Sequence, residues 1–145
     1  MSYIVLGLLS ALFAALVTIT GKIALQGIDS TLLAGVRAFF ITSFIGTYIL
    51  FNLDQYKQYF HTPKLKEIVA MLLSALFGAL SWVVYFKALQ KAPNVKIVQA
   101  LDRLSIVFVV ILAFVVLHEK LTFWHVLGAI LMVVGTLLVG GIWPG

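Results

Sequence analysis

The chain contains no cysteine among its 145 residues, and only 10% of its residues are charged. The absence of cysteine excludes disulfide frameworks, iron–sulfur ligation and thiol chemistry. Soluble domains carry about 25% charged residues, so the scarcity of charge excludes an ordinary soluble fold. What the sequence has instead is 63% hydrophobic residues and a mean hydropathy of +1.14. This composition indicates a membrane protein with several spans.

Signatures of enzymes and of cofactor sites are also missing. The stretch "HEKLTFWH", which begins at His118, approaches a zinc-binding HExxH helix but has Thr122 where the second histidine is required. The sequence has no glycine-rich phosphate loop, nucleophile elbow or carboxylate pair, and His61 and His125 are scattered. We therefore expect no enzymatic activity, no metal and no cofactor.

Positive charge exceeds negative charge, with 10 lysines and arginines against 5 acidic residues. The lysines lie at the ends of apolar segments and do not form a run. Such lysines extend their charged ends to the membrane surface. The excess of positive charge therefore predicts contact with a lipid bilayer and not with nucleic acid.

Five apolar stretches reach the roughly 20 residues that a membrane-crossing helix needs. They are approximately residues 4–25, 31–51, 67–89, 95–117 and 121–142. The first has no basic segment before it and is interpreted as a retained helix, not a cleaved signal peptide. The sequence thus predicts an all-α, multi-pass protein of a prokaryotic cytoplasmic membrane, with one domain over residues 1–145.

The lysines do not choose an orientation for these five spans. Four lie on the side of the N-terminus and four on the other, namely Lys57, Lys64, Lys66 and Lys120 against Lys22, Lys87, Lys91 and Lys96. Because lysine and arginine bias sets topology, the balance indicates insertion in both orientations. The alternative is a single orientation, weakly favoured by the two arginines within spans, which lie nearer the second side.

A chain that inserts both ways can form an inverted-repeat dimer from two copies of itself. Many transporters place their substrate site between two such halves. Gly128 and Gly135 lie seven residues apart on one face of the fifth span, and small residues of this kind allow helices to approach closely. We expect the fifth span to contribute to the dimer contact.

Several polar and aromatic residues are predicted to lie at similar depths in the membrane. At a helical rise of 1.5 Å per residue, Arg37, Trp82 and Asp102 lie roughly 6 Å from the centres of their spans, all toward the side opposite the N-terminus. Lys22 lies about 11 Å from its centre on that side. A charge near the bilayer centre costs about 2.5–3.5 kcal/mol on insertion scales, so these groups predict a water-accessible cavity.

The charged neighbours Asp102 and Arg103 cannot share one face of a helix, because adjacent residues lie about 100° apart around its axis. We expect Asp102 to face the cavity and to pair with Arg37 or Lys22. The alternative is an ion pair with a structural role and no ligand.

Trp82 and Tyr85 are three residues apart and share a face of the third span. Aromatic rings with a polar group suit a pocket that stacks a substrate or holds a cation. The two rings are therefore predicted to flank the apolar part of a substrate.

Three stretches together resemble an EamA-type domain of the drug/metabolite transporter superfamily across nearly the whole chain. They are "FAALVTITGKIALQGIDSTLLAGVRAFF", "SWVVYFKALQKAPNVKIVQALDRLSIVFVVILAF" and "LHEKLTFWHVLGAILMVVGTLLVG". The resemblance implies one five-span half of a ten-helix, inverted-repeat transporter, assembled as an antiparallel homodimer. It also places Lys22, Arg37 and Glu119 at recurrent charged positions of the family.

The sequence departs from this family at two points. His118 stands where the larger family often has glycine, and "ALDRLS" occupies the start of a helix that is usually apolar. The related small multidrug resistance proteins use a glutamate in their first helix. The first span here has no acid, which counts against export of lipophilic cations.

The expected function is a secondary transporter, an exporter of a small anionic or zwitterionic metabolite that works by alternating access in a homodimer. Lys22, Arg37 and Arg103 outnumber Asp102, which favours a substrate with an anionic group. Asp102 or Glu119 would exchange a proton, or hold Arg37 when the site is empty. The alternative is a non-transporting scaffold or accessory subunit that pairs with another half-length chain.

Overall fold

The chain folds into helices that are long and apolar enough to cross a membrane. The computed structural model describes residues 2–59 and 64–141, and His61 lies outside this part. Five candidate spans are found there: Tyr3–Ala24, Ser30–Phe51, Leu65–Lys91, Val95–Leu117 and Phe123–Gly140. The described residues contain no strand. The predicted all-α class and the five spans are therefore confirmed.

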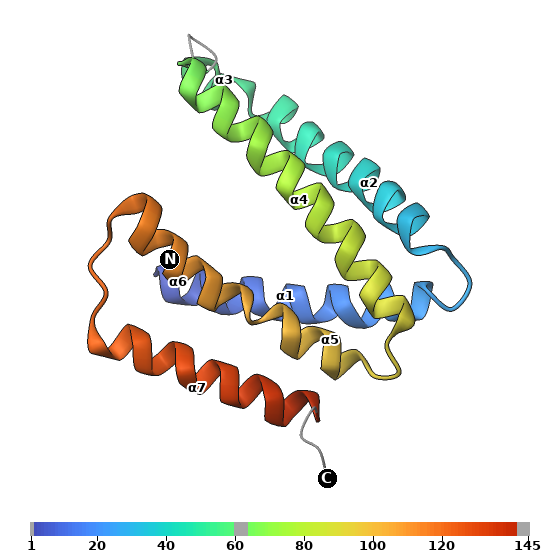
Figure 1. The fold of residues 1–145 in the computed structure, drawn as a ribbon. Helices are drawn as coiled ribbons and strands as arrows, with labels where there is room; N and C mark the ends of the chain where they lie inside the picture. The colour runs from blue at the N-terminus through green and yellow to red at the C-terminus, as the bar shows by residue number, and fades with distance from the viewer. Residues whose placement is uncertain (1, 60–63, 142–145) are drawn as a thin grey trace. The chain divides into compact units, whose positions relative to one another are not determined.

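The helices form two compact units, residues 1–22 with 91–145 and residues 23–90. The first unit contains most of α1 (Tyr3–Ala24), with α5 (Val95–Asp102), α6 (Ser105–Leu117) and α7 (Phe123–Gly140). In this unit α7 runs back along α6 and α5 (Figure 1). Polar side chains join α1 to α5, because the Thr18 hydroxyl lies 2.9 Å from Gln99 Oε1.

The second unit contains α2 (Ser30–Phe51), α3 (Leu53–Tyr56), the short 3₁₀ helix η1 (Lys57–Tyr59) and α4 (Leu65–Lys91). Figure 1 shows α2 and α4 running side by side in opposite directions. Near the connection from α1 to α2, Gln90 Nε2 at the end of α4 donates to the Ile28 carbonyl at 3.3 Å. On α4, Phe86 and Leu89 are only 1% and 0% exposed.

Side chains that accept backbone hydrogen bonds begin three of the spans. Asp29 Oδ1 accepts from the N–H groups of Thr31 at 2.8 Å and Leu32 at 3.1 Å, which caps α2. At the start of α4, Glu67 Oε2 accepts from Lys64 N–H at 3.1 Å. His125 Nδ1 accepts from Thr122 N–H at 3.3 Å. The last contact explains why α7 begins at Phe123 and not at residue 121 as expected.

The fourth span is not one continuous helix, which differs from the sequence prediction. Between α5 and α6, Arg103 N–H donates to Ala100 O at 3.1 Å and Leu104 N–H donates to Leu101 O at 3.0 Å. These bonds reach back three residues, as in a 3₁₀ turn. Within the described chain, neither Ser105 N–H nor Asp102 C=O takes part in a backbone hydrogen bond. No proline or glycine stands at this break, but aspartate and serine are poorer helix formers than the apolar residues around them.

The end of α6 shows why the family often has glycine at the position of His118. His118 has a φ of 55° and is the only residue other than glycine with a positive φ in the described part of the chain. The next residue, Glu119, donates its N–H to Ala113 O at 3.2 Å, a bond that reaches back six residues and closes the end of α6. Glycine adopts this left-handed conformation without a steric penalty, so the position favours the residue that the family often has there.

Replacing Asp29 tests the cap of α2. Its hydrogen bonds with the N–H groups of Leu32 and Thr31 lower the pKa of the Asp29 carboxyl below its ordinary value. We expect Asp29→Ala to lower the thermal unfolding midpoint at neutral pH and Asp29→Asn to preserve it, because asparagine caps equally well.

The pH dependence has a defined sign. Because the folded pKa is depressed, the carboxylate stabilises the fold above its ordinary pKa and loses this effect as the pH falls through the folded pKa. Wild type should therefore lose stability relative to Asp29→Asn during acidification. Equal midpoints for Asp29→Ala and Asp29→Asn at neutral pH would contradict the cap.

Replacing His118 by glycine should stabilise the protein. A left-handed conformation costs a residue with a side chain roughly 1–2 kcal/mol, and the greater freedom of glycine in the unfolded chain offsets about half of that. We expect His118→Gly to raise the thermal midpoint in detergent and His118→Ala not to raise it. A lower midpoint for His118→Gly would show that the imidazole makes a stabilising contribution of its own.

Candidate functional site

Arg37 of α2 lies against two aromatic rings of α4 in the second unit. Its guanidinium carbon is 5.6 Å from the ring centroid of Trp82 and 4.9 Å from that of Phe86. Both distances fall within the roughly 6 Å of a cation–π contact. The sequence predicts the same depth in the membrane for Arg37 and Trp82, and in the structure the two side chains are in contact.

The helical geometry explains why one arginine meets two rings. Trp82 and Phe86 are four residues apart, so they lie on the same face of α4 in successive turns. Arg37 lies about 10 Å along α2 from Ser30, the first residue of that helix. Trp82 and Phe86 lie farther and nearer than this, respectively, when measured along α4 from its last residue, Lys91. The guanidinium therefore rests between consecutive turns of α4.

The hydrogen-bonding capacity of Arg37 is not filled. Its side chain is half-buried, and its Nε is a buried nitrogen with no hydrogen-bond partner within the part of the chain that the structure describes. No carboxylate of the described residues forms a salt bridge with it. A guanidinium has five donors and stays charged. Its electrostatic environment is therefore aromatic, without a compensating anion.

Tyr85 extends the aromatic side of this site. Its ring packs edge-to-face on Phe86, with centroids 5.4 Å apart and an interplanar angle of 76°. Trp82 is 38% exposed, whereas Phe86 is buried. Trp82 is therefore partly exposed beside the guanidinium of Arg37, while Phe86 contacts the guanidinium from the buried side. We call Arg37, Trp82, Tyr85 and Phe86 the arginine–aromatic cluster.

Lys22 belongs to the first unit and forms a hydrogen bond with a backbone carbonyl of the same unit. Its Nζ donates to the Ala92 carbonyl at 2.8 Å, which joins the end of α1 to the connection between α4 and α5. Ala92 precedes Pro93 and follows the last residue of α4, so its carbonyl is not part of a helix. The lysine thus satisfies a carbonyl that the helical ladder leaves open.

The other sequence-predicted residues of the first unit are dispersed. Asp102, the last residue of α5, is exposed and has no salt bridge within the described chain, so the expected pair with Lys22 is not formed. The other expected pair, Asp102 with Arg37, joins residues of different units and stays a prediction. Glu119 is exposed and lies in the connection between α6 and α7.

Arg103 lies beside a groove between α5 and α7 that the sequence did not reveal. The groove has a volume of about 340 Å³. Its α5 side consists of Lys96, Gln99 and Ala100, continued by Arg103 in the turn after α5. Its α7 side consists of Met132, Gly135, Thr136 and Val139. We call it the α5–α7 groove.

Metal-ligating residues do not gather in the described part of the chain. No group of three or more histidine, aspartate or glutamate side chains lies close enough there to hold an ion. His125 caps α7 through its Nδ1, which gives "HEKLTFWH" a structural role at a helix start.

Comparison with known proteins identifies the family. The model of the EamA-like transporter family matches residues 1–141. The chain belongs to this family. It is also 34% identical over 132 residues to a protein of Sinorhizobium sp named as an uncharacterized transporter in the cobO 3′ region, a match that covers 91% of this chain and 92% of the relative. No solved structure shows a significant match to the chain.

Membership in the EamA-like family gives the general function. Together with five apolar helices, it makes the chain a multi-pass membrane protein and a transporter of the drug/metabolite type. The activity of the family is transport and not catalysis. Arg37, one of the positions that the family resemblance had marked, is the residue around which the aromatic side chains gather.

Sequence reasoning missed two parts of this EamA-like chain. Phe86 carried a signal, because it lies four residues after Trp82 on the same face of the helix. The α5–α7 groove carried none, since its depth depends on how closely α7 approaches α5. Gly135 contributes to it, because a Cβ added there would meet no atom within 4 Å.

Proposed function

We propose that the chain is one half of a secondary transporter that exports a small anionic or zwitterionic metabolite. The observation that carries this proposal is the half-buried guanidinium of Arg37, which lies between Trp82 and Phe86 with its Nε unpartnered in the described chain. Each half would contribute one arginine–aromatic cluster to an antiparallel homodimer that works by alternating access.

The chemistry of the arginine–aromatic cluster supports an anionic substrate group. The rings stabilise the positive charge through their faces but cannot accept the hydrogen bonds of the guanidinium as a carboxylate does. A planar guanidinium binds a carboxylate through two parallel hydrogen bonds. Trp82 and Tyr85 would then contact the apolar part of the same metabolite, and Lys22 would add positive charge at the end of α1.

The interruption of the fourth span supports a role for Asp102 in coupling. Unpaired backbone groups within a membrane are tolerated where they line a cavity or meet water, and Ser105 N–H and Asp102 C=O have no backbone partner in the described part of the chain. An exposed carboxylate at this break could accept and release a proton during each cycle. Glu119, in the connection before α7, is the second residue that we propose for proton exchange.

The helix bounds support the proposed dual insertion. With spans ending at Ala24, Phe51, Lys91, Leu117 and Gly140, the eight lysines still divide four against four between the two sides. The Sinorhizobium relative aligns over 92% of its own length, so it has a similar size. Two such chains in opposite orientation would provide the ten spans of an inverted repeat.

Transport assays with Arg37 variants test the substrate proposal. In proteoliposomes under a proton gradient, we expect flux of at least one carboxylate-bearing metabolite among amino acids and organic acids. A hydrogen bond to a charged group contributes about 1.5–3 kcal/mol, so Arg37→Gln should lower kcat/KM by roughly 10- to 100-fold. Arg37→Lys should fall between, because it keeps the charge but loses the planar pair of donors.

The matched control removes an exposed charge from the same unit. Asp54 pairs with Lys57 at 2.6 Å in the connection after α2, so Asp54→Asn changes the net charge by one unit without altering the lysine balance that sets orientation, and it should leave flux unchanged. Absence of flux for every carboxylate, together with a stability loss in Asp102→Asn, would favour the scaffold or accessory subunit instead.

A topology assay tests the antiparallel dimer. C-terminal reporters that are active on opposite sides of the membrane should both give signal for the wild-type chain. Gln26 and Gln55 lie on opposite sides, in connections flanking α2. One added lysine should therefore decide the orientation, and Gln26→Lys and Gln55→Lys should each leave one reporter active, a different one in each case. Signal from one side alone in wild type would exclude dual insertion.

A further inference from the structure

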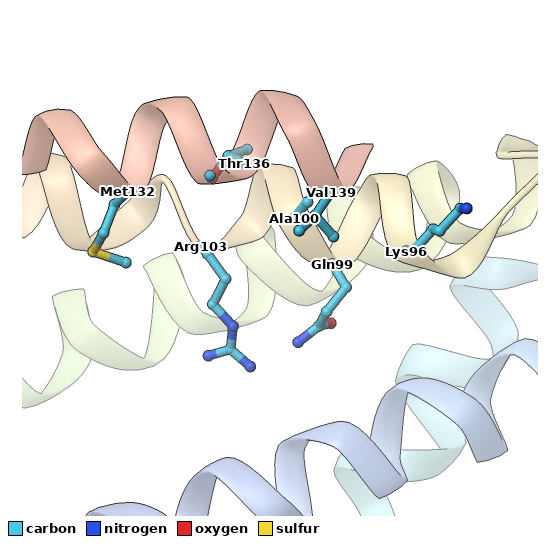
Figure 2. A pocket seen from close by; sticks show the side chains of 8 residues that line it. Lys96, Gln99, Ala100, Arg103, Met132, Thr136 and Val139 are labelled. Atoms are coloured by element: carbon cyan, nitrogen blue, oxygen red, sulfur yellow. The ribbon is translucent and has the colours of Figure 1, made fainter. Parts of the chain in front are cut away.

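The α5–α7 groove is a second place where positive charge meets an apolar surface. Lys96 and Arg103 are the only charged residues that line it, and no acidic residue does. They are seven residues apart, Lys96 near the start of α5 and Arg103 in the turn after its end, which separates them by about 10 Å along the span. In Figure 2 the side chains of Gln99 and Arg103 extend from α5 toward the same side.

The start of α5 adds to the positive potential at one end of the groove. Asn94 at the N-cap makes no side-chain hydrogen bond with the first turn, so the first N–H groups of α5 are not capped in this way. Unpaired N–H groups at a helix start carry partial positive charge. Lys96, the second residue of α5, is exposed at this end, where the span meets the membrane surface.

Small residues create the space between the two helices. Ala100 on α5 and Gly135 and Thr136 on α7 all line the groove, and a Cβ at Gly135 would meet no atom within 4 Å. Met132 and Val139 continue the α7 side with apolar groups. The groove is open along its length and mainly apolar, with its cations on the α5 side only.

We propose that the α5–α7 groove binds an anionic phospholipid, with the lipid phosphate beside Lys96 and Arg103 and an acyl chain over Gly135. Basic pockets between transmembrane helices bind the head groups of anionic lipids. Lys96, the second residue of α5, lies at the depth of those head groups, and Arg103 lies two turns deeper in the span. The proposal does not depend on the transported substrate, because the groove contains no residue of the arginine–aromatic cluster.

The shape of the groove favours a lipid over a small soluble anion. A soluble phosphate needs hydrogen-bond donors on several sides, whereas here the side opposite the cations offers one hydroxyl, that of Thr136, among Met132, Gly135 and Val139. An amphipathic ligand matches both surfaces at once. A second copy of α7 is the other apolar occupant, but it offers no negative charge, since α7 contains no acidic residue.

Thermal unfolding in neutral detergent tests the proposal with defined lipids. Phosphatidylglycerol should raise the midpoint in a concentration-dependent manner, as a ligand of the folded state does. Phosphatidylcholine and sn-glycerol 3-phosphate should not. A basic residue near an anionic lipid contributes about 1 kcal/mol, so Lys96→Gln should require about fivefold more phosphatidylglycerol for the same shift. Gly135→Leu should abolish the shift by filling the groove.

Two matched variants control for nonspecific effects. Gly128 lies two turns earlier on the same face of α7, and a Cβ there would also meet no atom within 4 Å. Gly128→Leu should therefore keep the full response to phosphatidylglycerol. Lys91→Gln removes a cation from the same end of the spans without touching the groove and should also keep it.

Several outcomes would overturn the proposal. Equal stabilisation by phosphatidylcholine would exclude a charge-selective site, and equal stabilisation by glycerol phosphate would identify a soluble anion as the ligand. If Gly135→Leu converted a dimer to a monomer while the phosphatidylglycerol response stayed intact, the groove would be a dimer contact. If Gly135→Leu failed to fold, an unchanged lipid response in Lys96→Gln would still reject the proposal.

Discussion

The fold depends on how it places charged groups in spans that would otherwise be apolar. A charge near the bilayer centre costs several kcal/mol unless it meets water, a partner or a polarizable surface. Three cations within the candidate spans meet different surfaces. Arg37 rests against the faces of Trp82 and Phe86, Lys22 donates to the Ala92 carbonyl, and Arg103 lies beside the α5–α7 groove. Of these three cations, only Arg37 is stabilised by aromatic rings, which cannot accept its hydrogen bonds and so leave its donors for a ligand.

This division gives the two units different tasks in the proposed transporter. The arginine–aromatic cluster supplies a charge and a stacking surface, which together suit a metabolite with an anionic end and an apolar body. The interrupted fourth span supplies Asp102 at a point where the backbone is also unpaired, a combination that transporters use at hydrated sites. The α5–α7 groove has cations without rings, and it matches an amphipathic lipid better than a substrate that must be released.

Hydropathy and residue depth predicted much of this structure. The five spans follow from long apolar runs, and the similar depth of Arg37 and Trp82 agrees with their contact in the structure, which the sequence did not specify. Depth does not give direction around a helix axis, so Phe86 was missed and Asp102 was expected to pair with Arg37 or Lys22. The break after Asp102 could not be predicted, because no proline or glycine stands there. The left-handed conformation of His118 depends on how α6 ends. The groove arises from the way α7 packs along α5, with small residues such as Ala100 and Gly135 leaving space between the helices, and the packing of distant helices is not encoded in local sequence.

Nitrogen NMR of the arginine side chains tests most directly the claim that Arg37 binds the anionic group of the substrate. The chain has two arginines, Arg37 and Arg103, so labelled protein gives two Nε–H signals, and Arg103→Lys assigns them. On addition of a transported carboxylate, the Nε–H signal of Arg37 should move in a saturable manner with the concentration dependence of transport, while that of Arg103 stays in place. An unchanged Arg37 signal under conditions in which the protein transports that carboxylate would contradict the account.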